Sequence, residues 1–321
     1  MAAARAEHPM TYAVVLAAAL IAVAHAAIFV RMADADPLVT AAWRMLIASL
    51  VLLPLALATS QTDIRRLTGR EWNLIAGGAV FLALHFATWI ASLDYTSIAN
   101  SVVLVTLTPV WLAVWAVVAL HRPPGRQTWL AVCLALAGSI VLGSGSARLG
   151  LATLWGDALA LAGGILFVGF LLLAESARRT VALVPFVTLV YAGAALLLWA
   201  TVLALGLPLA GLSLETYLAF IGLGLFSQII GHTGFNWAVK AIPPMVLALL
   251  FLAEPLLSAG LGWLYFGEGI VRETVIGGGL ILAAIYLGMR ASATRPPQSK
   301  RDEIRRQNDY RRPPGRTTGR R

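Results

Sequence analysis

The stretch of sequence that decides the fold is residues 242–268, IPPMVLALLFLAEPLLSAGLGWLYFGE. It is long and apolar enough to cross a bilayer, which takes about 20 residues of α-helix, and Glu254-Pro255 lies near its middle. A carboxylate at that depth costs about 3 kcal/mol or more, and Pro255 leaves the carbonyl of Phe251 without its helical N–H donor. Two costly features side by side within a membrane predict a functional site.

The same arrangement occurs earlier in the chain, where residues 97–122 are SIANSVVLVTLTPVWLAVWAVVALHR. A shift of 146 positions places Pro255 on Pro109. A second pair of similar tetrapeptides, PLVT at 37–40 and PFVT at 185–188, is offset by 148 positions. Because the two pairs agree in order and nearly in offset, they predict that the chain consists of two homologous halves.

The composition indicates a protein that crosses the membrane many times, since 59% of its 321 residues are hydrophobic, against about 45–50% in soluble domains. The predicted membrane segments are 11–30, 36–57, 72–93, 97–120, 127–143, 152–174, 183–206, 214–239, 243–266 and 272–290. Five fall in residues 9–144 and five in residues 150–290, so the second half must enter the membrane from the opposite side. The predicted fold is therefore an all-α integral membrane protein with ten transmembrane helices in two inverted five-helix repeats. Inverted repeats with proline-broken helices are typical of secondary transporters.

Charges in the predicted loops indicate the orientation of the chain. With the N-terminus inside, the cytoplasmic loops carry eight basic residues, Arg65, Arg66, Arg70, Arg122, Arg126, Arg178, Arg179 and Lys240. The opposite loops carry three, Arg31, Arg148 and Arg272. Arginine outnumbers lysine 22 to 2, a bias associated with GC-rich bacterial genomes. We expect a bacterial inner-membrane protein with both termini in the cytoplasm.

The net charge of +9 belongs mainly to the C-terminal tail. Residues 290–321 contain 11 Lys/Arg and three Asp/Glu, whereas the rest of the chain contains 13 and 12. The tail is rich in Pro and Arg and has no apolar periodicity, so residues 291–321 are predicted to be a basic, disordered cytoplasmic tail. Anionic lipid is its expected partner. Nucleic acid is not an expected partner, because the sequence shows no folded nucleic-acid-binding domain beside the basic tail.

Several motifs resemble those of one transporter family. AWRMLIA at residues 42–48 is similar to the arginine-bearing motif in the second helix of EamA-type proteins. LAEP at 252–255, Gly267-Glu268 and IGGGLIL at 276–282 resemble the end of their second repeat. With the duplicated ten-helix plan, the chain resembles the EamA-type members of the drug/metabolite transporter superfamily. The resemblance implies an exporter of amino acids or related metabolites. In the first repeat, His121-Arg122 stands where Gly-Glu would be expected.

Polar and aromatic side chains near the middle of the predicted helices are the candidate site residues. The candidates for substrate binding or coupling are Glu254, His85, His232, Gln228, Asn236, Trp89, Trp111 and Arg44, and the candidate hinges are Pro109 and Pro255. Gln228, His232 and Asn236 recur every four residues and so share one face of a helix. A cavity walled by indoles, amides and imidazoles, to which Trp237 would also contribute, suits an amphiphilic organic solute. No cofactor and no metal ion are predicted.

Other interpretations of these residues and of the function stay open. Polar side chains also hold membrane helices together, at about 0.6 kcal/mol each, and this alternative applies to the histidines and to Arg44. An intramembrane enzyme acting on lipid or peptide is one rival function, although the sequence has no local metal-binding motif and no base placed beside a nucleophile. A phosphorylated-solute or nucleotide-sugar exchanger is another, but Arg44 is the one deep cation.

The source of energy for transport is a further expectation from the sequence. No phosphate-binding Walker A motif occurs, so ATP is not the direct source. Glu254 could couple transport to protons, and so could a histidine, because imidazole titrates near neutral pH. Facilitated diffusion is the alternative.

We predict that a phosphatase active only in the periplasm is active when fused after Ser146 and inactive when fused after Arg179. The reason is the bias of eight basic residues against three between the two sets of loops. Phosphatase activity in intact cells measures this, and a reporter active only in the cytoplasm provides the matched control at the same two positions. The reverse pattern would contradict both the orientation and the cytoplasmic location of the termini.

Overall fold

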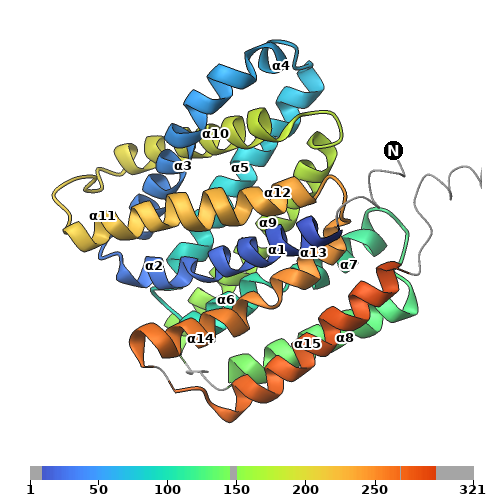
Figure 1. Cartoon of the computed structure of the whole chain (residues 1–321). Coiled ribbons are helices and arrows are strands. Elements are labelled where there is room, and N and C mark those ends of the chain that lie inside the picture. The colour runs from blue at the N-terminus through green and yellow to red at the C-terminus, as the bar shows by residue number, and fades with distance from the viewer. Residues whose placement is uncertain (1–8, 145–149, 268, 294–321) are drawn as a thin grey trace, which may run out of the picture.

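The computed structural model describes residues 9–144, 150–267 and 269–293, and within these ranges all regular structure is helical (Figure 1). The first half contains α1 (Pro9–Ala24), α2 (Ala26–Met32), α3 (Pro37–Thr59), α4 (Gln61–Arg65), α5 (Gly69–Ser92), α6 (Ile98–Val105), α7 (Thr108–Val118) and α8 (Arg126–Ser144). The second half contains α9 (Leu151–Ala177), α10 (Leu183–Ala204), α11 (Leu214–Ile221), the π-helix η2 (Gly222–His232), α12 (Thr233–Ala238), α13 (Pro244–Phe251), α14 (Glu254–Phe266) and α15 (Arg272–Ala293).

Within the described ranges, ten helical segments are long and apolar enough to cross a membrane, five in each half. This result confirms the predicted all-α fold with ten membrane helices in two repeats. The helix α15 continues to Ala293, beyond the predicted start of the basic tail at residue 291. Residues 294–321 of that tail lie outside the described residues, as does Glu268.

Two of the membrane segments are broken at equivalent positions. The helix α6 ends at Val105 and α7 begins at Thr108. In the second half, α13 ends at Phe251 and α14 begins at Glu254. The offset of 146 positions relates both pairs of helix ends. Thr108 and Glu254 are therefore equivalent residues of the two repeats.

Each break is followed by a proline, which is the second residue of α7 and of α14. At the start of a helix the missing N–H costs no hydrogen bond, because that N–H has no intrahelical partner. In the first break, the N–H of Leu107 donates to the carbonyl of Leu104, only three residues back. The hydroxyl of Thr106 donates to the carbonyl of Val103 at 3.1 Å and so satisfies a group that the break would leave free.

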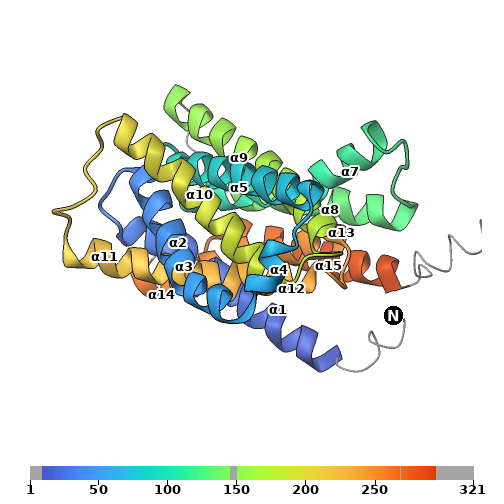
Figure 2. The ribbon, with the colours of Figure 1, turned by 90° about the horizontal axis from the view of Figure 1, so that it is seen from above.

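The packing of the helices repeats between the two halves. The helix α3 packs along α10 and α8 packs along α15, and each of these contacts joins equivalent helices of the two halves. The contact of α5 with α9 has its counterpart in the contact of α1 with η2 and α12. Figure 1 shows α8 beside α15 at one edge, and Figure 2 shows α1 and α9 on opposite sides of the bundle. This reciprocal pattern is that of inverted repeats.

One of the basic loop residues is buried. Arg178 is 4% exposed, and its Nε donates to the backbone carbonyl of Asn236 at 3.1 Å. Its Nη1 donates to the carbonyl of Val181, and burial lowers the pKa of the guanidinium. Arg178 therefore joins the end of α9 to the end of the eighth membrane segment, in addition to contributing to the loop charge.

The contact between α8 and α15 depends on two glycines. A Cβ added at Gly277 would lie 2.6 Å from the carbonyl oxygen of Gly138 and 2.7 Å from the backbone nitrogen of Leu142. A Cβ added at Gly138 would lie 2.8 Å from the carbonyl oxygen of Gly277. Because these neighbours are backbone atoms, a side chain at either position would force the helices apart.

We predict that Gly277→Ala lowers the free energy of unfolding by about 1–3 kcal/mol, since the new methyl group overpacks this contact. Gly279→Ala is the matched control in the same run of glycines, because no atom lies within 4 Å of a Cβ added there. Alanine is also about 1 kcal/mol better than glycine within a helix, so the control should not lose stability. Thermal unfolding of both purified variants tests this, and equal losses would contradict the close contact.

Candidate functional site

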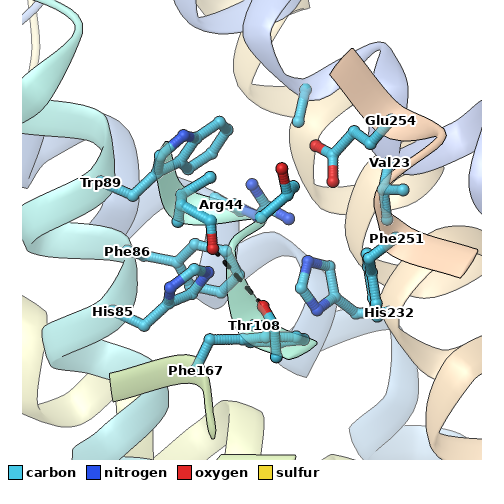
Figure 3. A pocket seen from close by; sticks show the side chains of 13 residues that line it. Val23, Arg44, His85, Phe86, Trp89, Thr108, Phe167, His232, Phe251 and Glu254 are labelled. Atoms are coloured by element: carbon cyan, nitrogen blue, oxygen red, sulfur yellow. Dashed lines mark hydrogen bonds between the residues drawn. The ribbon is translucent and has the colours of Figure 1, made fainter. Parts of the chain in front are cut away.

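A cavity lined by buried side chains lies where the two repeats meet (Figure 3). Seven of the ten membrane segments contribute to it, including both broken ones. The lining residues are Val23, Ala26, Arg44, His85, Phe86, Trp89, Val105, Thr106, Thr108, Phe167, His232, Phe251 and Glu254.

Glu254 enters the cavity from the second broken segment. It is the first residue of α14 and the eleventh of the 23 residues of its membrane segment. Its side chain is only 8% exposed. The break therefore presents a carboxyl group at mid-segment, where an uninterrupted helix of the same composition would present an apolar side chain.

Arg44 of α3 is completely buried and lies beside this carboxyl group (Figure 3). Its Nε donates to Oε1 of Gln228 at 2.9 Å. Its guanidinium lies over the ring of Phe86, with Cζ 3.9 Å from the ring centroid, which is a cation–π contact. In the described part of the chain, no ion pair within 4.0 Å joins Arg44 to Glu254.

The histidines and their aromatic neighbours form another wall. The Nδ1 of His85 lies 2.9 Å from the carbonyl oxygen of Gly163, and because a carbonyl only accepts, this nitrogen carries a proton. The ring of His232 lies 6.5 Å from that of His85, 5.3 Å from Phe86 and 5.8 Å from Phe167, measured between ring centroids. This wall is apolar except for the ring nitrogens.

Trp89 lies beside His85, with the two rings nearly parallel and their centroids 6.3 Å apart. Its side chain is 3% exposed, and its Nε1 has no hydrogen-bond partner among the residues that the structure describes. A buried indole usually finds an acceptor for this N–H. Trp89 lines the cavity and therefore carries an unused donor near it.

The structure brings together five of the eight candidate substrate or coupling residues at the cavity, namely Arg44, His85, Trp89, His232 and Glu254. Gln228 does not line the cavity but holds Arg44. Asn236 lies further along, where its Nδ2 donates to the carbonyl of His232 at 2.8 Å and to the hydroxyl of Tyr191 at 3.5 Å.

The remaining aromatic candidates lie elsewhere. Trp111 is partly buried against the larger hydrophobic core and does not line the cavity. Trp237 stacks on Tyr12 with ring centroids 4.5 Å apart. In this structure Trp111 and Trp237 pack against other side chains outside the cavity lining. The two prolines, Pro109 and Pro255, lie at the starts of α7 and α14, beside the cavity.

Sequence reasoning missed several lining residues. Phe86, Phe167 and Phe251 are apolar and look like ordinary membrane-helix residues. The repeat offset of 146 positions could have identified two pairs of equivalent residues that line the cavity. It relates Thr108 to Glu254 and Val105 to Phe251.

The eighth membrane segment differs from the predicted continuous α-helix. Its central 11 residues, Gly222–His232, form the π-helix η2. Such helices are rare beyond a single turn and often occur at functional sites. A Cβ added at Gly224 would lie 2.6 Å from Cγ2 of Ile47, so glycine lets η2 approach α3 closely. This close approach brings Gln228 to Arg44, while His232 reaches the cavity.

In the described part of the chain, no group of three or more His, Cys, Asp and Glu residues is arranged to hold a metal ion. His85, His232 and Glu254 share the cavity without forming such a group. The arrangement is suited to binding an organic molecule between aromatic rings, with one cation, one carboxyl group and two imidazoles around it.

The inverted repeats, the paired broken helices and the cavity between them define a membrane transporter. The model of the EamA-like transporter family matches residues 10–144 and 154–290. The chain therefore belongs to the EamA-like transporter family, as its motifs indicated.

Its relatives agree with this assignment. An uncharacterized transporter of Archaeoglobus fulgidus is 28% identical over 280 residues, which cover 87% of this chain and 95% of that protein. The uncharacterized transporter YwfM of Bacillus subtilis (strain 168) is 26% identical over 277 residues, 84% of this chain and 88% of the other. A crystal structure at 17% identity superposes with a TM-score of 0.72 and covers 89% of this chain and 99% of its own, which bears on the fold alone.

We predict that Gln228→Leu lowers the free energy of unfolding by about 2 kcal/mol, because it removes the acceptor of a hydrogen bond from a buried charge. Ser227→Ala is the matched control, since Ser227 is the adjacent buried residue and its hydroxyl has no partner in the described part of the chain. Thermal unfolding of the two purified variants in the same detergent measures the difference. Equal stability of the two variants would mean that the bond between Gln228 and Arg44 contributes nothing.

Proposed function

We propose that this transporter is a secondary exporter of small amphiphilic metabolites, amino acids among them, and that it works by alternating access. The observation that supports this most directly is the meeting of two broken helices, one from each repeat, at one buried cavity. Secondary transporters with inverted repeats bind their solutes at such helix breaks. The cavity would open to one side of the membrane and then to the other.

The breaks at residues 106–107 and 252–253 are the proposed hinges. Backbone hydrogen bonding is weakest there, because the α-helical ladder stops and Pro109 or Pro255 follows. The parts of each broken helix can therefore change their relative angle with little loss of hydrogen bonds. The long contacts of α3 with α10 and of α8 with α15 would stay packed during this motion.

The chemistry of the lining supports an amphiphilic solute. Phe86, Phe167 and Phe251 provide apolar surface, whereas Arg44 and Glu254 provide one charge of each sign. A zwitterion with an apolar side chain has matching groups. An inorganic ion would leave the aromatic surface unused, so an organic metabolite suits the cavity better.

The loop charges support one orientation of the protein in the membrane. We propose that it lies in a bacterial inner membrane with both termini in the cytoplasm, and that the basic tail beyond residue 290 contacts anionic lipid there. The solute would then enter the cavity from the cytoplasm and leave on the periplasmic side.

We also propose that export is coupled to protons through Glu254. This residue is the one acidic side chain among those that line the cavity. A buried carboxyl group with access to each side in turn can take up a proton on one side and release it on the other. Facilitated diffusion needs no such group, so the two mechanisms predict different pH dependence.

We predict that Glu254→Gln abolishes pH-driven flux of amino acids in proteoliposomes while the protein stays folded, because the amide preserves size and hydrogen bonding but cannot titrate. Glu254→Asp should retain part of the flux, since it shortens the side chain but keeps the carboxyl group. The measurement is uptake or efflux of labelled amino acids across an imposed pH gradient, with thermal unfolding followed in parallel.

Glu215→Gln is the matched control for this experiment. It makes the same chemical change at an exposed carboxylate at the start of α11, away from the cavity. Wild-type pH dependence in Glu254→Gln would exclude coupling through Glu254. Coupling would then have to involve His85 or His232, or transport would be facilitated diffusion.

A further inference from the structure

Three hydrogen-bond donors of the cavity lining are unused. Among the residues that the structure describes, Nη1 and Nη2 of Arg44 and Nε1 of Trp89 are buried without a hydrogen-bond partner. Arg44 is 0% exposed and Trp89 is 3% exposed, so water on the protein surface cannot satisfy these groups. A buried donor without an acceptor costs about 1–3 kcal/mol, and more if it is charged.

The side chains around Arg44 do not supply the missing acceptors. Gln228 accepts only from Nε. The hydroxyls of Thr106 and Thr108 donate to carbonyls of the broken helix, and their oxygens accept no hydrogen bond from Nη1 or Nη2 of Arg44 in the described structure. Nε2 of His85 and the carboxyl oxygens of Glu254 can accept, but among the described residues neither group makes a hydrogen bond with Nη1 or Nη2 of Arg44. The guanidinium edge of Arg44 and the indole N–H of Trp89 therefore remain for a ligand.

We infer that Arg44 and Trp89 form a carboxylate subsite in the cavity, in which Nη1 and Nη2 bind the two carboxylate oxygens and Trp89 Nε1 donates to one of them. The inference rests on the proposed function, because it assigns a chemical class to the solute of the same cavity. The planar fork of a guanidinium matches a carboxylate in this bidentate way. The stacking of Arg44 on Phe86 and its bond to Gln228 hold the fork in place.

Charge selects a monoanion. Apart from the histidines, Arg44 is the one cationic side chain that lines the cavity, and Glu254 already contributes a carboxyl group. A phosphate ester with a charge near −2 would leave unbalanced negative charge in a buried site, which is costly. A carboxylate is balanced by Arg44 when Glu254 is protonated or when Glu254 faces an ammonium group of the same ligand. An ammonium group on the same ligand would in turn face Glu254, on the other side of Arg44 from Trp89 (Figure 3).

The test measures binding to the full-length purified protein in lipid nanodiscs by calorimetry. The probes are acetate, 3-phenylpropionate, 3-phenylpropionamide, phenethylamine and phenylalanine. We expect saturable binding of 3-phenylpropionate and tighter binding of phenylalanine. 3-Phenylpropionamide has the same carbon skeleton as 3-phenylpropionate without the charge, so it should bind at least 10-fold more weakly than 3-phenylpropionate. Phenethylamine, which lacks the carboxylate, should also bind at least 10-fold more weakly than phenylalanine.

Two tryptophan variants make a matched pair. Trp89→Phe keeps an aromatic ring and removes the N–H, so it should weaken the binding of 3-phenylpropionate by about 10-fold. Trp111→Phe removes a buried and unpartnered indole N–H that does not line the cavity, so binding should change less than about 2-fold. Arg44→Lys keeps the charge without the fork and should weaken binding at least as much as Trp89→Phe. The pair of tryptophan variants tests the carboxylate subsite even if Arg44→Lys does not fold.

Three results would overturn the carboxylate subsite. They are equal binding of the amide and the acid, equal effects of Trp89→Phe and Trp111→Phe, and the absence of saturable binding of every carboxylate from acetate to phenylalanine. Flux in proteoliposomes separates this inference from the proposed function. Flux of phenethylamine as fast as that of phenylalanine would support the proposed transport function and exclude the carboxylate subsite. Carboxylate binding without flux of any probe would support the carboxylate subsite and exclude the proposed export function.

Discussion

A helix that breaks inside a bilayer must find partners for the backbone groups that the break frees, because lipid offers none. This constraint governs the centre of the protein. Thr106 supplies a hydroxyl within the first break, and Ser258 of α14 donates to the carbonyl of Ala24 at 3.0 Å, at the point where α1 gives way to α2. Such partners exist only in the protein interior, so the two broken helices lie between the repeats. The cavity forms at the same place because the helices are interrupted there.

The charges of the cavity obey a related constraint. A guanidinium and a carboxyl group buried in one small volume balance each other's charge, which lowers the cost of burying either. The close approach of η2 to α3 brings Gln228 within 2.9 Å of Arg44, across 184 positions of sequence. The ring of Phe86 covers one face of the same guanidinium. Among the described residues, Arg44 is thus held by groups that leave Nη1 and Nη2 without a hydrogen-bond partner, and the proposed carboxylate subsite rests on this arrangement.

The candidate site was only partly predictable from the sequence. Arg44, His85, His232 and Glu254 could be chosen because polar groups are costly in apolar helices, and all four line the cavity. The same reasoning could not separate Trp89 from Trp111, since both are indoles within apolar segments. Which of them faces the cavity depends on how each helix is rotated about its axis, and packing against neighbouring helices sets that rotation. Phe167 and Phe251 carry no polar atom and could not be distinguished from lipid-facing residues.

The sequence by itself determined the ten membrane segments, their duplication and the two breaks, because the thickness of a bilayer dictates helix length and proline dictates where a helical ladder stops. Only the tertiary structure decided which polar groups meet. Hydrogen bonds such as that from Arg44 to Gln228 join residues far apart in the chain, and their formation depends on the winding of η2. That winding departs from an α-helix through packing that includes the close contact of Gly224 with Ile47. Local residue preferences do not encode such a contact between helices.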